Sequence, residues 1–125
     1  MVKGLLDTAI VVDLLRSHVP AQEWLARQEG LGVSPIVWLE IIEGSKNLRA
    51  QGQAIRLLRH FERIELAPVD SEWGIRQALR FRLSHNVDAL DCLIASSAHR
   101  LNVPLYTHNL KHFVPMIGNL AQKPY

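Results

Sequence analysis

Four short apolar runs of strand type, separated by segments with helical patterning, constrain the fold more than any other feature of this sequence. The runs are Lys3–Leu6, Leu31–Val33, Ile64–Leu66 and Val103–Tyr106. Consecutive strands with helices between them are joined by right-handed crossovers, which place the strands parallel. The pattern therefore predicts an α/β fold with a short, mainly parallel central sheet.

Helical segments fill the intervals between these runs. The expected helices are Ala9–Arg16, Pro20–Glu29, a helix from Pro35, then Ala54–Phe61, Ser71–Leu83 and Ala89–His99. Ser34 is a typical N-cap with proline following at the first helical position. We expect the helix from Pro35 to break near Gly52, and Asp70 to cap the helix that begins at Ser71.

The composition is that of an ordinary globular protein. The chain has 125 residues, 48% of them hydrophobic and 21% charged, which argues against a disordered or membrane-spanning class. The length suits one domain, residues 1–125. A single cysteine, Cys92, excludes an internal disulfide, and no signal peptide is recognisable, so we expect a cytoplasmic protein.

The net charge is close to balanced, with 14 basic and 12 acidic residues, and says little about nucleic acid binding. Arginines nevertheless cluster in two segments. One segment carries Arg49, Arg56, Arg59 and Arg63, and the other carries Arg76, Arg80 and Arg82. Either group fits a solvated helix face or a patch that contacts phosphates.

Polar residues follow the expected strands, where open parallel sheets place their functional crevice. Asp7 and Thr8 follow the first run, the helix with Glu40 follows the second, Asp91 opens the helix before the fourth, and Thr107, His108 and Asn109 follow the fourth. Each acid alone has a simpler interpretation: Asp7 as a helix cap, Glu40 as a solvent-facing helix residue, and Asp91 as an acid favoured at a helix start.

Together, the three acids indicate a metal site. Partly buried carboxylates repel one another and tolerate burial only with a cation or a shared proton. Oxygen ligands without a Cys or His cluster at zinc-like spacing suit Mg²⁺ or Mn²⁺. Such an ion activates water and neutralises charge on a phosphate, so the residues predict phosphodiester hydrolysis.

Four segments, in order along the chain, resemble the motifs of PIN-domain nucleases, and in particular of VapC-type toxins from toxin–antitoxin pairs. They are Leu5–Arg16 with Asp7 and Thr8, Ser34–Gly44 with Glu40, Asp91–Ala98, and Thr107–Phe113, which a short C-terminal tail follows. The resemblance implies a three-layer α/β/α fold with four or five strands. It further implies a Mg²⁺- or Mn²⁺-dependent endoribonuclease that acts on RNA, forms a homodimer and is blocked by a VapB-like antitoxin in its active-site groove.

Carried over by motif, Asp7, Glu40 and Asp91 would be the catalytic, metal-binding acids, and Thr8 and Thr107 would support them through hydrogen bonds. The departure from the pattern lies at Asn109, where many members of the family have a fourth acid. An asparagine removes one negative charge and leaves the number of metal ions open. Asp88, one helical turn before Asp91, could compensate or could simply be an acid at a helix start.

Two other functions compete with this one. A metal-free ribonuclease would use histidines as acid and base, and the candidates are His85, His99, His108 and His112. A non-cleaving module would bind an antitoxin or nucleic acid without hydrolysis. A histidine ribonuclease keeps its activity in EDTA, whereas the metal enzyme should lose it. In the metal enzyme, Asp7→Asn should abolish cleavage and leave partner binding largely intact, which distinguishes it from a binding module. For the metal enzyme we expect products with a 5′-phosphate and a 3′-hydroxyl.

Overall fold

The computed structural model describes residues 1–125 and contains five strands and seven α-helices. In chain order the elements are β1 (Gly4–Leu6), α1 (Thr8–Leu15), α2 (Val19–Ala26), β2 (Leu31–Val33), α3 (Pro35–Gly44), α4 (Leu48–Leu58), β3 (Glu62–Arg63), α5 (Pro68–His85), α6 (Ala89–Leu101), β4 (Leu105–Tyr106), α7 (Leu110–Ile117), the 3-10 turn η1 (Gly118–Leu120) and β5 (Ala121–Gln122).

The five strands form one parallel sheet with the order β3-β2-β1-β4-β5. The strand β1 is central, and its Leu5 pairs with Gly32 of β2 and Leu105 of β4. Gly32 allows a close approach between strands, because a Cβ atom there would lie 3.0 Å from the carbonyl oxygen of Glu62. The predicted parallel sheet of four or five strands is confirmed.

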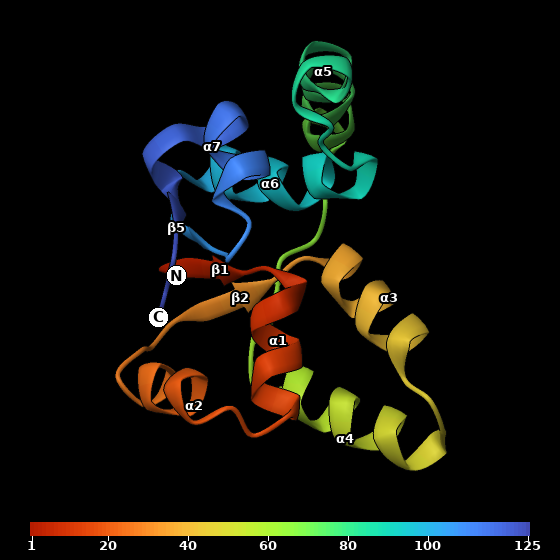
Figure 1. Cartoon of the computed structure of the whole chain (residues 1–125), viewed down its shortest axis with the longest axis vertical. Coiled ribbons are helices and arrows are strands. Elements are labelled where there is room, and N and C mark those ends of the chain that lie inside the picture. The colour runs from red at the N-terminus through yellow and green to blue at the C-terminus, as the bar shows by residue number, and fades with distance from the viewer.

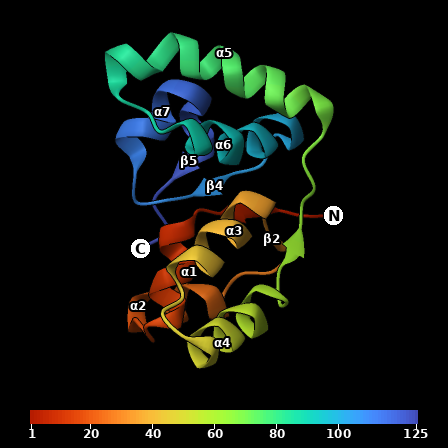
Figure 2. The same ribbon diagram turned by 90° about the vertical axis from the view of Figure 1, so that its right-hand side faces the viewer.

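Helices cover both faces of this sheet, which gives the expected three layers (Figures 1 and 2). Helices α1, α2 and α4 lie on one face, and α5, α6 and α7 lie on the other. Helix α3 follows the carboxyl end of β2 and contacts both α1 and α6. The core consists of 28 buried hydrophobic residues, among them Leu5, Leu6, Ile10 and Phe113. None of the helices is long and apolar enough to cross a membrane.

The predicted break near Gly52 is wrong. Helix α3 ends at Gly44, and α4 begins at Leu48 and continues through Gly52 to Leu58. Asn47 caps the new helix, because its side chain accepts a hydrogen bond of 2.8 Å from the backbone N–H of Ala50. A glycine inside a helix costs only about 1 kcal/mol relative to alanine, and the cap together with buried packing of the helix overcomes that cost.

The predicted start of α5 is also wrong, because the helix begins at Pro68 rather than Ser71 and runs on to His85. Asp70 is not the N-cap but the third helical residue, and its Oδ2 accepts a hydrogen bond from the backbone N–H of Ala67 at 2.8 Å. Pro68 occupies the first helical position, where its missing N–H has no cost. The acid therefore stabilises the helix start from inside the first turn.

The third strand and the C-terminus differ from expectation as well. The strand β3 is Glu62–Arg63, not Ile64–Leu66, and it lies at the edge of the sheet with exposed side chains. The residues after Phe113, predicted only as a short tail, complete α7, which begins at Leu110, and continue as η1 and β5. Helix α7 buries Phe113, Met116 and Ile117 against the core despite its internal Pro115, so packing rather than local propensity forms it.

Candidate metal centre

Asp7 lies directly after β1 and is held by two hydrogen bonds. The backbone N–H of Thr8 donates to Oδ1 at 2.8 Å, and the hydroxyl of Thr107 donates to Oδ2 at 2.7 Å. The residue is 7% exposed and is also the N-cap of α1. The helix-cap interpretation and the site interpretation of Asp7 are therefore compatible, because one oxygen serves the helix while Thr107 fixes the other.

Thr107 connects two parts of this centre from the end of β4. Its side chain is fully buried. Its hydroxyl donates to Asp7 and accepts a hydrogen bond of 2.9 Å from the backbone N–H of Asn109. The neighbouring strands β1 and β4 are parallel, so the residues that follow each strand meet at the same edge of the sheet. Thr107 thereby fixes both the Asp7 carboxylate and the start of the turn before α7.

Glu40 reaches the same edge from α3. The hydroxyl of Thr8 donates a hydrogen bond of 2.5 Å to Oε1 of Glu40, and the glutamate is half-buried. Glu40 is therefore more than the solvent-facing helix residue that the sequence alone allows. Thr8 ties Glu40 to Asp7, since its backbone N–H bonds one acid and its hydroxyl the other.

Asp91 lies in the first turn of α6 and is half-buried. Loss of hydration, followed by the negative charges of Asp7, Asp88 and Glu40, raises the pKa of Asp91 from 3.8 to about 7. Burial likewise raises the pKa of Asp7, although the hydrogen bonds from Thr107 and Thr8 and the charge of His108 oppose that shift. The centre therefore holds more negative charge than its own donors neutralise.

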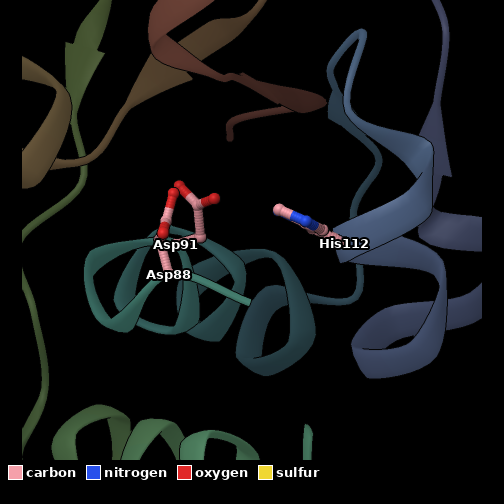
Figure 3. A group of neighbouring side chains, drawn as sticks. All are labelled: Asp88, Asp91 and His112. Atoms are coloured by element: carbon pink, nitrogen blue, oxygen red, sulfur yellow. The ribbon is translucent and has the colours of Figure 1, made fainter. Parts of the chain in front are cut away.

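A closer cluster contains Asp88, Asp91 and His112, whose potential ligand atoms all lie within 4.8 Å of one another (Figure 3). Asp7, Glu40 and Asp91 do not form such a group, so at least one pair of these acids is farther apart. Magnesium sites commonly use only one or two carboxylates and retain several waters, so this spacing is compatible with a shared ion. The sequence predicts for His112 only the role of an acid–base residue.

His112 is oriented by Asn109, because Nδ2 of Asn109 lies 2.9 Å from Nδ1 of the imidazole. The sequence predicts no helix at α7, so the three-residue spacing of Asn109 and His112 is the only signal for this pair. Among the other candidate histidines, His108 lies 3.4 Å from Asp13 and close enough to Asp7 for its charge to lower the pKa of that acid, whereas His85 and His99 are exposed. No hydrogen bond links two of these histidines, and only His112 shares a potential metal-binding group with the acids.

A cavity of about 480 Å³ opens beside Thr8 and Glu40, between α1, α3 and α4. Two cations, Arg16 and Lys46, line it, and Glu40 is the only acid among its lining residues. Neither cation forms an ion pair with an acid within 4.0 Å. The cavity can therefore accept an anionic group next to the carboxylates.

Comparison with known proteins gives a consistent result. The PIN domain family model matches residues 4–113. Ribonuclease VapC19 from Mycobacterium tuberculosis is 33% identical over 97% of this chain and 98% of that protein. A toxin–antitoxin complex from Klebsiella pneumoniae has a chain with a TM-score of 0.76 and 23% identity, covering 98% of both chains. VapBC2 from Rickettsia felis, solved with a promoter DNA fragment, gives a TM-score of 0.74, also at 23% identity, covering 94% of this chain and 95% of that chain.

Proposed function

Because the chain belongs to the PIN domain family, we propose that it is an endoribonuclease, the toxin of a toxin–antitoxin pair. It hydrolyses phosphodiester bonds of RNA with the help of Mg²⁺ or Mn²⁺ held by Asp7, Glu40 and Asp91. Two observations carry the proposal: Thr8 and Thr107 form hydrogen bonds to Asp7 and Glu40, and the charges of Asp7 and Glu40 contribute, after burial, to the raised pKa of Asp91.

The residues present fit a hard divalent cation. The donors that converge here are mainly carboxylate oxygens, which Mg²⁺ and Mn²⁺ prefer. Burial, followed by repulsion from Asp7, Asp88 and Glu40, raises the pKa of Asp91 to about 7, and a bound cation would offset that repulsion. When bound, such an ion would lower the pKa of a water molecule and offset the negative charge of the scissile phosphate.

The protein side chains would contribute orientation and charge. Thr107 and the backbone of Thr8 hold the Asp7 carboxylate in one rotamer, and Thr8 holds Glu40. Preorganised groups of this kind need little rearrangement as the reaction proceeds. In the proposed hydrolysis, a water oxygen bonds to phosphorus in line with the leaving group, the P–O3′ bond breaks, and the 3′ oxygen takes a proton. The products are a 5′-phosphate and a 3′-hydroxyl.

The cationic helix α4 supports a nucleic acid substrate. From Gly44 to Phe61 the chain contains no Asp or Glu. Its cations, Lys46, Arg49, Arg56 and Arg59, are all exposed and form no ion pair within 4.0 Å. Lys46 lines the cavity beside Glu40. A backbone of phosphates leaving the acidic centre would meet these charges.

The partners proposed with this activity are a VapB-like antitoxin and a second copy of the chain. An antitoxin segment that binds in the cavity beside Thr8 and Glu40 would block access to the metal centre.

Helix α5 supports dimerisation, because Ile75, Leu79 and Leu83 recur every four residues and are 61%, 79% and 99% exposed. Such an apolar stripe is typical of an interface. A cytoplasmic location belongs to the same proposal.

Cleavage of RNA by the purified chain tests the proposal. We expect cleavage with Mg²⁺ or Mn²⁺, none with EDTA, and ends with a 5′-phosphate. The matched variants are Glu40→Gln, at the centre, and Glu43→Gln, which changes an exposed acid one turn later on the same helix. Glu40→Gln should lose at least tenfold in rate, whereas Glu43→Gln should retain the rate of the wild type.

Asp7→Asn distinguishes an enzyme from a binding module. The variant should lose cleavage yet still bind the antitoxin, with an unchanged circular dichroism spectrum. Cleavage that persists in EDTA, or products with a 2′,3′-cyclic phosphate, would contradict a metal-dependent hydrolysis. A wild-type protein that binds its antitoxin and RNA but never cleaves with Mn²⁺ present would favour the non-cleaving module instead.

A further inference from the structure

We infer that His112 is a metal ligand, which together with Asp88 and Asp91 forms a cation position that prefers Mn²⁺ to Mg²⁺. This inference rests on the proposed function, because it assumes that a divalent ion belongs to this centre. It adds a nitrogen donor to a centre for which the sequence predicts only oxygen ligands, and it assigns Asn109 the role of orienting that donor.

The geometry of the three side chains suits one ion. Asp88 and Asp91 project from the start of α6, and His112 extends toward them from α7 (Figure 3). Their potential donor atoms lie within 4.8 Å of one another. Bonds of about 2.0–2.2 Å from a metal to nitrogen or oxygen place opposite ligands up to about 4.4 Å apart. Small side-chain rotations therefore bring the three donors around a common centre.

Asn109 holds the imidazole in the orientation that a ligand needs. In the structure Nδ2 of its amide lies 2.9 Å from Nδ1 of His112, an arrangement in which the neutral ring carries its proton on Nε2. Binding a cation through Nε2 requires this proton to move to Nδ1. Histidine ligands usually donate their second ring N–H to a protein oxygen, which fixes the tautomer and the ring plane. The amide of Asn109 can offer its Oδ1 for this purpose by rotating its terminal group.

The backbone of Asn109 connects this pair to the rest of the centre. Its N–H donates to the hydroxyl of Thr107, which in turn donates to Asp7. An aspartate at position 109 could bind a cation directly, but a neutral asparagine is a weaker ligand. Position 109 therefore supplies no charged oxygen ligand, whereas His112, one helical turn later, supplies a nitrogen donor.

The present partner of Asp88 does not block the site. Arg82 lies 3.7 Å from Oδ1 of Asp88, and both side chains are more than half exposed. An exposed ion pair of this length contributes little to stability, so a divalent ion can replace the arginine as the partner of this carboxylate.

The choice of metal follows from the mixed donor set. Imidazole nitrogen suits transition metals, whereas Mg²⁺ favours oxygen ligands in a near-ideal octahedron. A site with one nitrogen and two carboxylates therefore binds Mn²⁺ more tightly than Mg²⁺. We expect the ratio of the Mn²⁺ affinity to the Mg²⁺ affinity to fall by about tenfold when the imidazole is removed.

Pulsed electron paramagnetic resonance of the Mn²⁺-loaded protein tests the inference without measuring activity. We expect a ¹⁴N coupling typical of imidazole bound to Mn²⁺ in the wild type. The coupling should disappear in His112→Gln and persist in His99→Gln, the matched control, whose exposed histidine stacks on Trp73 and has no contact with the acidic cluster. Circular dichroism identifies any variant that fails to fold.

Two further measurements keep the inference falsifiable. Competition between Mg²⁺ and Mn²⁺ gives the affinity ratio for the wild type and for Asn109→Ala, which keeps His112 but removes its orienting amide. The ratio should fall in Asn109→Ala as well. A wild type without nitrogen coupling, or a coupling that survives in His112→Gln, would overturn the inference.

Failure of this inference differs from failure of the proposed function. Metal-dependent RNA cleavage without a nitrogen coupling would refute the ligand role of His112 and leave the ribonuclease intact. Nitrogen coupling without cleavage of any RNA would support the metal position and refute the ribonuclease.

Discussion

Replacing Asp91 by asparagine is expected to stabilise the metal-free protein at alkaline pH. Burial and three neighbouring acids raise the pKa of Asp91 from 3.8 to about 7, so the folded state holds this proton more tightly than the unfolded state. The stability that the proton contributes is fully present below pH 3.8 and is lost as the pH rises through about 7. Asparagine does not titrate, so the variant avoids this loss.

The size of the effect follows from the pKa difference. Raising a pKa from 3.8 to about 7 corresponds to about 4 kcal/mol. Asp91 is only partly buried, and solvent screening at such a site reduces this to about 2 kcal/mol. In EDTA, the free energy of unfolding of Asp91→Asn should therefore exceed that of the wild type by about 2 kcal/mol at pH 8 and by nearly nothing at pH 4.

Urea unfolding with EDTA at both pH values measures this difference, and Glu43→Gln, an exposed acid on α3, provides the control. Saturating Mn²⁺ should reverse the order at pH 8, because a ligand at 100 times its dissociation constant stabilises the protein that binds it by about 2.7 kcal/mol. An Asp91→Asn variant that matches the wild type at both pH values, or a wild type that Mn²⁺ does not stabilise, would refute the reasoning.

Three further predictions follow from the same structure. Thr107→Val should destabilise the fold by about 1–3 kcal/mol in urea unfolding, because Oδ2 of Asp7 loses its only side-chain donor; an unchanged stability would argue against this bond. Arg56→Gln on α4 should reduce the slope of the logarithm of the single-stranded RNA binding constant against the logarithm of salt concentration by about 0.7, whereas Arg76→Gln on α5 should leave this slope unchanged. Equal effects of the two variants would contradict the proposal that α4 binds RNA. Leu79→Glu should convert a dimer into a folded monomer in analytical ultracentrifugation, and a persistent dimer would exclude the α5 stripe as the interface.

The parts of the fold that followed from the sequence are those with strong local signals. The apolar run before Asp7 and the run Leu31–Val33 gave the central strands, because buried parallel strands are continuously apolar. Ser34 before Pro35 marked the start of α3, and the structure confirms this cap through the hydrogen bond from Ile36 N–H. Where a cap or an apolar run was unambiguous, the element could be predicted.

The remaining parts depend on tertiary contacts. The strand β3 consists of exposed Glu62 and Arg63 and is defined by its pairing with β2, not by hydrophobicity. Helix α7 contains Pro115, which argues locally against a helix, yet its buried Phe113 stabilises it against the core. His112 became a candidate ligand only because α7 turns it toward α6. The sequence predicts a common site for Asp7, Glu40 and Asp91, but it contains no signal that brings this histidine to them.

Anomalous X-ray scattering from crystals grown with Mn²⁺ would test the central claim most directly. The account predicts a manganese peak within about 2.0–2.6 Å of carboxylate oxygens, or one water away from them, with Asp7, Glu40 and Asp91 all directed at the same ion. A peak that none of these acids faces, or no peak in crystals of a protein that binds Mn²⁺ in solution, would contradict it.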